Sequence, residues 1–431
     1  MFFSKKLKIS PSQVIIVSSF SLILIGTFLF YLPITHAENL PFIDAFFTSV
    51  SLSTGTGLMS VSIRDFTPFG LTIIALITQI SSLGLIFLTL FLLRKFYSNS
   101  HKTINQLSSE LLGVDTKKKF RTTISFILKC TLAIELISSF ILFFKVKLFF
   151  PPAKAFFYSV FHSIAAFSNI GISLFPGNMQ LFQTDYTILL TLTALMLLGS
   201  VNFLTIKEII NNGSSYYKKN KISFSRPTII ILKTTGLLFV TSFLLIFILE
   251  YNNAFAKMDI ITKIMNSFFL AISSMGTGMR TIHPNMMKIP TLLIIASIAY
   301  IGTSPGSTGS GIKTTTFAIF LATMRSIIYK KKQVTLSAKV IENSQINKAF
   351  VIIVFSMITI IITSLFLLIT EKNIPFFDLL FESISAFSTL GISTETTPLL
   401  SNLGKIFISI AMFLGRFGPF TLIFALIENE L

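Results

Sequence analysis

Four glycine-containing turns recur along this chain, and the chemistry they offer is that of exposed backbone rather than of side chains. Two of them share one pattern, Ala165-Ala-Phe-Ser-Asn-Ile-Gly-Ile-Ser173 and Ser385-Ala-Phe-Ser-Thr-Leu-Gly-Ile-Ser393. The other two share a second pattern, Gly55-Thr-Gly-Leu58 and Gly276-Thr-Gly-Met279. The equivalent glycines are Gly57, Gly171, Gly278 and Gly391, each with a phenylalanine ten residues earlier. Their spacing of about 110 residues is too long for a solenoid unit and indicates duplicated subdomains.

A half-helix that descends into a membrane and ends at such a turn points the negative end of its dipole at the centre, which favours a cation there. Glycine permits positive φ, so that carbonyl oxygens can turn inward and replace the hydration shell of a monovalent cation. The candidate filter residues are Gly57, Gly171, Gly278 and Gly391 with the backbone neighbours Thr56, Asn169, Ile170, Thr277, Thr389 and Leu390. The alternative is that each glycine only caps a re-entrant hairpin or allows close helix packing.

The composition is that of an integral membrane protein. Of the 431 residues, 52% are hydrophobic and only 12% are charged, and the mean hydropathy is +0.80. A soluble globular chain is far less apolar. Lys and Arg outnumber Asp and Glu by 35 to 17, but in a membrane protein the position of charges matters more than their sum, so we expect no nucleic-acid partner. The single cysteine, Cys130, excludes an intramolecular disulfide.

The elements that position the turns follow from the apolar runs. A spanning helix needs about 20 apolar residues. Spans are predicted near 13–33, 70–93, 122–148, 186–206, 227–250, 290–327, 347–370 and 403–427. Between the members of each pair lies a stretch too short to cross, at 42–54, 155–168, 259–274 and 376–389, and each ends at a glycine turn. The first run is too long for a cleaved signal and is interpreted as a retained span.

We therefore predict an all-α integral membrane fold, with four span–pore-helix–span repeats arranged pseudo-fourfold around a central ion pore. The repeats are expected at 1–95, 120–210, 225–328 (with a broken sixth span) and 345–431. Cytoplasmic loops are expected at 96–119, 211–224 and 329–344. The basic segments 94–121, 207–226 and 325–348 place these loops and both termini in the cytoplasm by the positive-inside rule. Exceptions on the outer side are Lys145, Lys147 and Lys154.

The sixth span contains Gly302-Thr-Ser-Pro-Gly-Ser-Thr-Gly-Ser-Gly-Ile-Lys-Thr-Thr-Thr316, which cannot hold a regular helix. It lacks the lysine placement and the preceding strand of a phosphate-binding loop. We interpret it as a flexible gating segment below the filter, and a passive kink is the alternative. The gating candidates are Gly302, Pro305, Gly306, Gly309, Gly311 and Lys313.

Arg416, in Phe413-Leu-Gly-Arg-Phe-Gly-Pro-Phe420, lies inside the last apolar span. An intramembrane arginine is costly and usually faces a cavity or a partner. We expect Arg416 to modify the electrostatics of the pore, and the alternative is an ion pair with Glu382 on the fourth half-helix. Glu135 and His162 are weaker signals, more typical of polar groups satisfied by packing than of ligands.

These motifs resemble the Trk/Ktr/HKT superfamily of potassium transporters, and within it the KtrB-type membrane subunit. The resemblance covers essentially the whole chain and rests on the four units, on Ser385–Gly391, on Ser304–Phe317 and on Gly415–Pro419. It implies K⁺ uptake through one pore per subunit of a homodimer in a bacterial cytoplasmic (inner) membrane, with Na⁺ as a possible activator. It also implies gating by the broken span under a cytosolic RCK-type nucleotide-binding subunit, with no covalent cofactor on this chain.

The sequence departs from the family pattern in two places. The third turn reads Ser274-Met-Gly-Thr-Gly-Met279 where the family often has Thr-Arg-Thr-Ala-Gly-Phe, and Gly199-Ser-Val-Asn-Phe203 lacks a second glycine. Because the sequence stops at Leu431, just past the last span, we expect any regulatory domain to be a separate partner that docks on the basic loops. A Na⁺-permeable or weakly selective transporter stays open as an alternative. We do not expect a membrane enzyme, because such an enzyme would need converging catalytic groups. We also do not expect a purely structural scaffold, because a scaffold would not need an intramembrane arginine.

Overall fold

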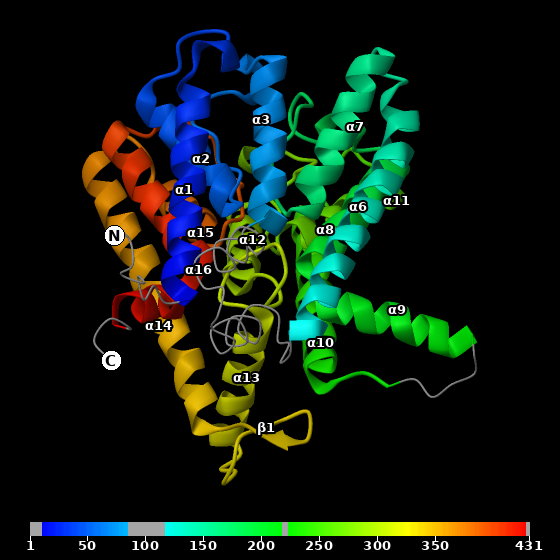
Figure 1. The fold of residues 1–431 in the computed structure, drawn as a ribbon, viewed down its shortest axis with the longest axis vertical. Helices are drawn as coiled ribbons and strands as arrows, with labels where there is room; N and C mark the ends of the chain where they lie inside the picture. The colour runs from blue at the N-terminus through cyan, green and yellow to red at the C-terminus, as the bar shows by residue number, and fades with distance from the viewer. Residues whose placement is uncertain (1–10, 85–116, 218–222, 428–431) are drawn as a thin grey trace, which may run out of the picture.

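The computed structural model describes residues 11–84, 117–217 and 223–427, and these parts of the chain form a helical bundle (Figure 1). The helices are α1 (Pro11–Tyr31), α2 (Phe42–Thr54), α3 (Pro68–Gln79), α6 (Lys117–Val146), α7 (Pro152–Phe167), α8 (Tyr186–Ser200), α9 (Phe203–Tyr217), α10 (Arg226–Glu250), α11 (Ile260–Ser273), α12 (Ile289–Ile301), α13 (Thr314–Ile328), α14 (Asn343–Thr370), α15 (Phe376–Phe387) and α16 (Asn402–Ile427). Within the described ranges, the two strands are β1 (Thr335–Leu336) and β2 (Lys339–Val340), a short antiparallel hairpin.

The four predicted short stretches are helices α2, α7, α11 and α15. Each packs against the longer helix that precedes it, α1, α6, α10 and α14 respectively. Local signals begin them: Pro152 occupies the first turn of α7, and the Asp259 carboxylate accepts hydrogen bonds from the backbone N–H groups of Ile261 and Thr262 at the start of α11. Each helix is 12 to 16 residues long, too short to cross a bilayer.

Three helices of the described chain are long and apolar enough to span a membrane: Ser125–Val146 within α6, α10 (Arg226–Glu250) and α14 (Asn343–Thr370). Their outward faces carry large apolar side chains. Examples are Leu136, Ile248 and Ile369, each more than 60% exposed. Such surfaces are unfavourable in water, and lipid chains cover them in a bilayer. The structure is therefore that of a membrane protein.

The helices that follow the half-helices are irregular, and the break after Ser200 corrects the span predicted at 186–206. A π-helical segment, Ile80–Gly84, follows α3, and α16 contains Gly418 with φ of +68°. Helices α8 and α9 are bent by 111° across a break of two residues. Only the interruption between α12 and α13 was predicted. Residues 85–93 of the second predicted span lie outside the described chain.

Asn202 lies at the sharp break after α8. Its side-chain Oδ1 accepts a hydrogen bond from the backbone N–H of Leu204 at 2.7 Å, which caps a new helix in place of continuing the old one. The new helix, α9, runs sideways from the bundle in Figure 1 and extends to Tyr217. The segment 211–224, expected to be a loop, is thus helical over its first residues.

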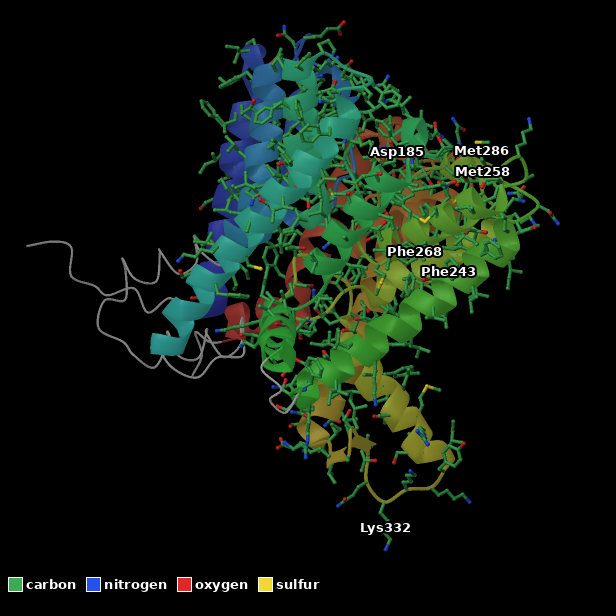
Figure 2. The ribbon with its side chains drawn as sticks, turned by 90° about the vertical axis from the view of Figure 1, so that its right-hand side faces the viewer. Asp185, Phe243, Met258, Phe268, Met286 and Lys332 are labelled. Atoms are coloured by element: carbon green, nitrogen blue, oxygen red, sulfur yellow. The ribbon has the colours of Figure 1, made fainter. Side chains whose placement is uncertain are left out.

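Lys332 and the labelled residues Asp185, Met258 and Met286 lie toward opposite ends of the molecule (Figure 2). In Figure 2, Lys332 lies at one extremity, while Asp185, Met258 and Met286 lie toward the other. Lys332 lies in the exposed segment between α13 and the hairpin, within the predicted basic segment 325–348. Of the other two basic segments, residues 94–116 and 218–222 lie outside the described chain.

Local partners surround the three lysines that the positive-inside rule does not explain. Lys145 lies 3.5 Å from the Asp185 carboxylate. Lys147 lies 4.4 Å from the centroid of the Phe144 ring, and Lys154 lies 5.3 Å from that of Tyr158. Cation–π contacts of this kind stabilise an ammonium group at an apolar surface.

The helices pack in a closed cyclic order. Helix α3 contacts α7, α8 contacts α11, α12 contacts α15, and α16 contacts α2, so each irregular second helix packs on the next half-helix. The last of these contacts joins the two ends of the chain through an ion pair: Lys405 Nζ of α16 donates to Asp44 Oδ1 of α2 at 2.6 Å, and both side chains are largely buried. This pair closes the cycle between residues that are 361 positions apart in sequence.

Removing one partner of this buried pair should destabilise the protein. Lys405→Met leaves the Asp44 carboxylate buried without a cation, and we expect a loss of about 3–5 kcal/mol, measured as a lower Tm of detergent-solubilised protein. The apolar double variant Asp44→Leu/Lys405→Met should recover most of that loss. Lys145→Met, which removes a more exposed pair, is the control and should cost at most about 1 kcal/mol. A wild-type Tm for Lys405→Met would contradict a stabilising role for the pair.

Candidate functional site: a ring of glycine turns above a polar loop

The four predicted glycines meet one another around the cycle. A Cβ atom placed on Gly57 would lie 3.0 Å from the backbone nitrogen of Gly171, and one on Gly171 would lie 2.5 Å from the carbonyl oxygen of Thr277. A Cβ on Gly278 would overlap the carbonyl oxygen of Leu390. A Cβ on Gly391 would overlap the carbonyl oxygen of Thr56, which closes the ring. The structure thus brings together the four glycine turns, with backbone atoms in contact.

Two different requirements keep glycine at these positions. Gly57, Gly278 and Gly391 have φ of +88°, +78° and +80°, a region that L side chains rarely adopt. Gly171 is not in this region, so the expectation of positive φ does not hold there, and the close approach of Thr277 alone excludes a side chain. Asn169 and Thr389, two residues before the ring glycines of the second and fourth turns, also have positive φ. Gly55 and Gly276 occupy the same place in the first and third turns.

Side chains of the half-helices hold the turns from within. Ser51 Oγ accepts a hydrogen bond from the backbone N–H of Gly57 at 3.0 Å. Ser385 Oγ donates to the carbonyl of Ile392 at 2.6 Å, and Ser273 Oγ donates to that of Met279 at 2.5 Å. Sequence reasoning did not single out these serines, although each lies five or six residues before its ring glycine.

His162 and Glu382 stand at the same position, nine residues before Gly171 and Gly391. His162 Nε2 lies 2.9 Å from Ser173 Oγ and accepts from the backbone N–H of Leu174, while the Glu382 carboxylate accepts a hydrogen bond from Thr397. Each of these two side chains therefore binds the segment that directly follows its glycine turn. This placement rules out the predicted alternative in which Glu382 neutralises Arg416. Glu135, likewise, accepts from Gln79 Nε2 at 3.1 Å.

The loop 302–313 lies directly beneath the ring and is tied to the second repeat. Ser304 donates from both its N–H and its hydroxyl to the carbonyl of Ser200, at 3.2 and 2.9 Å. Thr308 Oγ1 lies 3.1 Å from the carbonyl oxygen of Phe167, at the end of α7, and 3.0 Å from that of Gly199. Ser304 and Thr308 are buried. The loop therefore occupies the place where the second half-helix ends.

Asn169 connects this loop to the ring. Its side-chain amide lies within hydrogen-bonding distance of Thr308, Ser200 and Thr277, at 2.7, 3.2 and 2.5 Å. Thr277 precedes Gly278, so one amide links the second turn, the third turn and the loop. The sequence predicts Asn169 as a backbone ligand, and in the structure its side chain makes these additional contacts.

Arg416 lies next to the ring and is bound by neutral acceptors. Its Nη1 donates to the carbonyl of Thr308 at 2.5 Å, and its Nη2 donates to that of Ser81 at 3.0 Å. A Cβ placed on Gly55 would lie 3.3 Å from Nη1. Among the residues that the structure describes, no carboxylate lies within 4.0 Å of the Arg416 guanidinium, so no ion pair offsets its positive charge.

The remaining gating candidates shape the loop itself. Lys313 has φ of +79°, and its Nζ donates to the carbonyl of Gly309 at 2.7 Å, so its ammonium group folds back onto the loop. Gly302, Gly306 and Gly311 also have positive φ. The Pro305 carbonyl accepts a hydrogen bond from Asn202 Nδ2 at 2.5 Å, which joins the loop to the break between α8 and α9.

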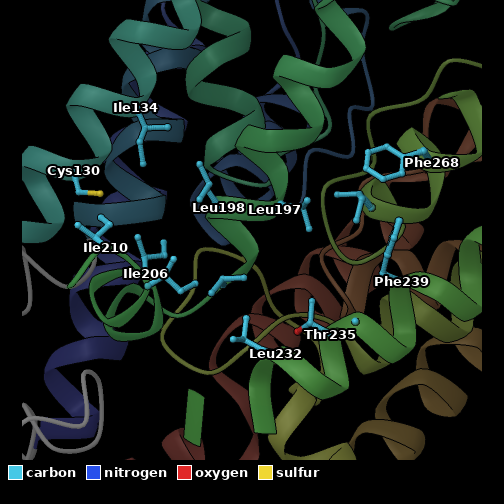
Figure 3. Close-up of a pocket in the computed structure, with 14 residues that line it drawn as sticks. Cys130, Ile134, Leu197, Leu198, Ile206, Ile210, Leu232, Thr235, Phe239 and Phe268 are labelled. Atoms are coloured by element: carbon cyan, nitrogen blue, oxygen red, sulfur yellow. The ribbon is translucent and has the colours of Figure 1, made fainter. Parts of the chain in front are cut away.

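Two cavities flank these elements. One, of about 550 Å³ and named the outer cavity below, borders the ring and is lined by Gly57, Gly171 and Gly391 together with the charged residues Arg64, Arg280 and Glu395. The other, of about 480 Å³, lies between α6, α8, α9, α10 and α11 (Figure 3). Its lining is aliphatic and aromatic apart from Cys130 and Thr235, so it offers a cation almost no ligands. In the described chain, no three His, Cys, Asp or Glu side chains gather as a metal site.

Comparison with known proteins gives one consistent result. Residues 6–430 match the family model for TrkH, described as a cation transport protein. The chain is 31% identical to Ktr system potassium uptake protein B of Bacillus subtilis over 99% of this chain and 95% of that protein. It is 30% identical to the protein of the same name from Vibrio alginolyticus, covering 99% of this chain and 93% of that one. It is 27% identical to the potassium/sodium uptake protein NtpJ of Enterococcus hirae, covering 97% and 93%.

The fold is also similar to a solved structure. The crystal structure of the potassium transporter TrkH from Vibrio parahaemolyticus matches with a TM-score of 0.77 over 98% of this chain and 86% of that one. The sequence identity is 18%, so this likeness concerns the fold.

The role of Asn202 in holding the loop can be measured directly. Asn202→Ala removes both the cap of α9 and the hydrogen bond to Pro305, so amide hydrogens of peptides covering 302–313 should exchange about tenfold faster. Asn212→Ala, a change on the exposed part of α9 where the asparagine contacts Ser223, should leave those peptides unchanged. Equal exchange in Asn202→Ala and wild-type protein would show that this contact does not hold the loop.

Proposed function

Because this chain belongs to the TrkH family of cation transport proteins, we propose that it takes up K⁺ across a bacterial cytoplasmic membrane through the ring of glycine turns. Among the observations, the cyclic contact of Gly57, Gly171, Gly278 and Gly391 carries the proposal. It comes from four chain segments that are far apart in sequence, and no side chain fits between them. A ring built of backbone can present carbonyl oxygens at a fixed distance from a dehydrated ion. The four span–pore-helix–span repeats would then surround one central pore.

The helix ends support a cation in the ring. The half-helices α2, α7, α11 and α15 all end at the turns, so their negative dipole ends converge there. The carbonyl oxygens of Thr56, Thr277 and Leu390 lie at the contacts between neighbouring turns. We propose these carbonyls, with those of Asn169, Ile170 and Thr389, as the ligands of the transported K⁺.

The loop 302–313 is proposed as the gate. It is packed against the end of α7 and against α8 beneath the ring, where it would obstruct an ion leaving the ring toward the cytoplasm. Its glycines have positive φ. Because glycine has no Cβ, the loop can rearrange between positive and negative φ without the strain that side chains would add. Arg416, which binds the loop through Thr308, would add a positive charge to the path and limit how many cations enter at once.

Control by partners is part of the proposal. The similar proteins named potassium uptake protein B are called parts of a Ktr system, which supports a membrane subunit that works with other components. We propose a homodimer that is surrounded by membrane lipid. A cytosolic RCK-type subunit, which binds the nucleotide, would regulate it, and Na⁺ would act as an activator. The exposed Lys330, Lys331 and Lys332 offer a docking surface at the end of the molecule where the proposal places the cytoplasm.

A less selective cation pathway is the second candidate. The relative from Enterococcus hirae is named a potassium/sodium uptake protein, and its name motivates this alternative. The two are separated by ⁸⁶Rb⁺ uptake into cells that lack their own K⁺ uptake systems, with K⁺ or Na⁺ as competitor. Inhibition by K⁺ alone supports the first candidate, and equal inhibition by both ions supports the second. Coexpression with an RCK-type subunit in the same cells tests the proposed regulation.

Gly391→Ser should weaken the preference for K⁺. The new side chain would overlap the Thr56 carbonyl and displace the ring oxygens, so we expect the ratio of K⁺ to Na⁺ competition to fall about tenfold. Gly236→Ser is the matched control, because a Cβ there meets no described atom within 4 Å. Unchanged competition in Gly391→Ser, at equal protein abundance, would remove this glycine from the filter.

Gly311→Ala tests the gate separately. Gly311 has φ of +88°, and a Cβ there would lie 2.8 Å from the Cα of Gly302, so the packed loop should loosen. We expect the rate of ⁸⁶Rb⁺ uptake to rise by about threefold without a change in the K⁺/Na⁺ ratio. Gly213→Ala, at an open position on α9, serves as the control. A change in selectivity instead of rate would contradict the gate assignment.

A further inference from the structure

Arg280 is the charged residue closest in sequence to the ring, two positions after Gly278. It lines the outer cavity together with Arg64, His283 and Glu395. Its side chain is only 19% exposed, in contrast to 51% for Glu395. A guanidinium held at the mouth of a cation pathway repels the ions that must enter, so its presence needs a physical reason.

The backbone of Arg280 is joined to the second turn. Its N–H donates to Asn178 Oδ1 at 3.0 Å, and its carbonyl accepts from the N–H of Met179 at 2.9 Å. The other side of the same amide, Asn178 Nδ2, donates to the carbonyl of Gly171 at 2.9 Å. One side chain therefore connects a ring carbonyl of the second turn to the segment that leaves the third turn.

The side chain of Arg280 is joined to the fourth turn. Its Nη1 donates to the carbonyl of Ser393 at 3.3 Å, two residues after Gly391. Its Nη2 lies 3.1 Å from Glu395 Oε1, and His283 Nε2 lies 2.9 Å from the same oxygen. The carboxylate of Glu395 thus faces the guanidinium and the imidazole, and no other carboxylate of the described chain makes an ion pair with Arg280.

We propose that Arg280 is a positioning residue that fixes the second, third and fourth turns relative to one another, and that Glu395 neutralises its charge so that cations can enter the outer mouth. This inference rests on the proposed function. It assigns two separable tasks to one ion pair: the hydrogen bonds of Arg280 to Ser393 and Asn178 govern ring geometry, and the carboxylate of Glu395 governs the local potential. Asn178 and Glu395 both have positive φ, at +66° and +68°, which non-glycine residues adopt only where contacts hold them.

The two tasks predict different kinetic effects. Glu395→Gln keeps the guanidinium and removes its compensation, so the apparent KM for ⁸⁶Rb⁺ should rise about threefold or more at low ionic strength, and less in high salt. Arg280→Gln removes the charge and the contact with Ser393, so the KM should not rise but the ratio of K⁺ to Na⁺ competition should fall. In the double variant, the KM should return toward the wild-type value while the selectivity stays low.

Two further variants sharpen the test. Arg280→Lys keeps the charge but has a single donor group, so selectivity should again fall while the KM changes little. Lys145→Gln, which removes an outer cation paired with Asp185 and not lining the cavity, should change neither quantity. All values are normalised to the amount of protein in the membrane, so a folding defect is separated from a transport defect.

An unchanged KM in Glu395→Gln, or an unchanged competition ratio in Arg280→Gln, would overturn the proposal while leaving the proposed function intact. Failure of the double variant to restore the KM would also overturn the electrostatic part, since the rise would then not come from the uncompensated guanidinium. If instead the wild-type protein takes up no ⁸⁶Rb⁺ or shows no preference for K⁺, the proposed function itself fails, and the inference fails with it.

Discussion

A backbone that stops being helical inside a membrane must find partners for its carbonyl oxygens, and this constraint governs the structure of the chain. Lipid provides no hydrogen bonds, so non-helical backbone persists only where protein or water meets it. The end of α7 illustrates the solution: the carbonyl of Phe167 accepts a hydrogen bond from Thr308, which belongs to a segment 141 residues away in sequence. The ring of turns and the loop beneath it are therefore one interdependent unit.

Glycine makes this arrangement possible in two ways. In the turns it allows neighbouring backbones to touch, as at Gly171 against Thr277. In the longer helices it lets the helix approach the end of a half-helix: a Cβ on Gly199 would overlap the carbonyl of Phe167, and one on Gly415 would overlap that of Phe387. Close packing of backbones in a membrane depends on such small residues.

The charged residues within the bundle are stabilised differently. Lys405 has a carboxylate partner in Asp44 and serves to join the first and last repeats. Arg416 has carbonyl and hydroxyl acceptors, which satisfy its donors without cancelling its charge. A charged residue with an oppositely charged partner therefore acts mainly on the stability of the fold, whereas one with neutral acceptors also changes the electrostatic potential around it.

The sequence by itself determined the class of protein and the four half-helices that end at the glycine turns, because apolar run length and glycine placement are local properties. It also located the ring glycines, since repetition places equivalent residues in equivalent positions. It did not reveal the bend at Asn202 or the π-helical segment Ile80–Gly84. Both carry contacts with distant parts of the chain: Asn202 donates to the carbonyl of Pro305, and the carbonyl of Ser81 accepts from Arg416.

Only the tertiary structure decided how the polar residues are paired. From the sequence, Glu382 was a plausible partner for Arg416, since both lie in the fourth repeat and both are costly in a membrane. In the fold, Glu382 accepts a hydrogen bond from Thr397, which follows its turn, while Arg416 reaches the loop and Ser81. Pairing is a property of distance in space, and in a cyclic bundle the nearest partner of a group often belongs to another repeat.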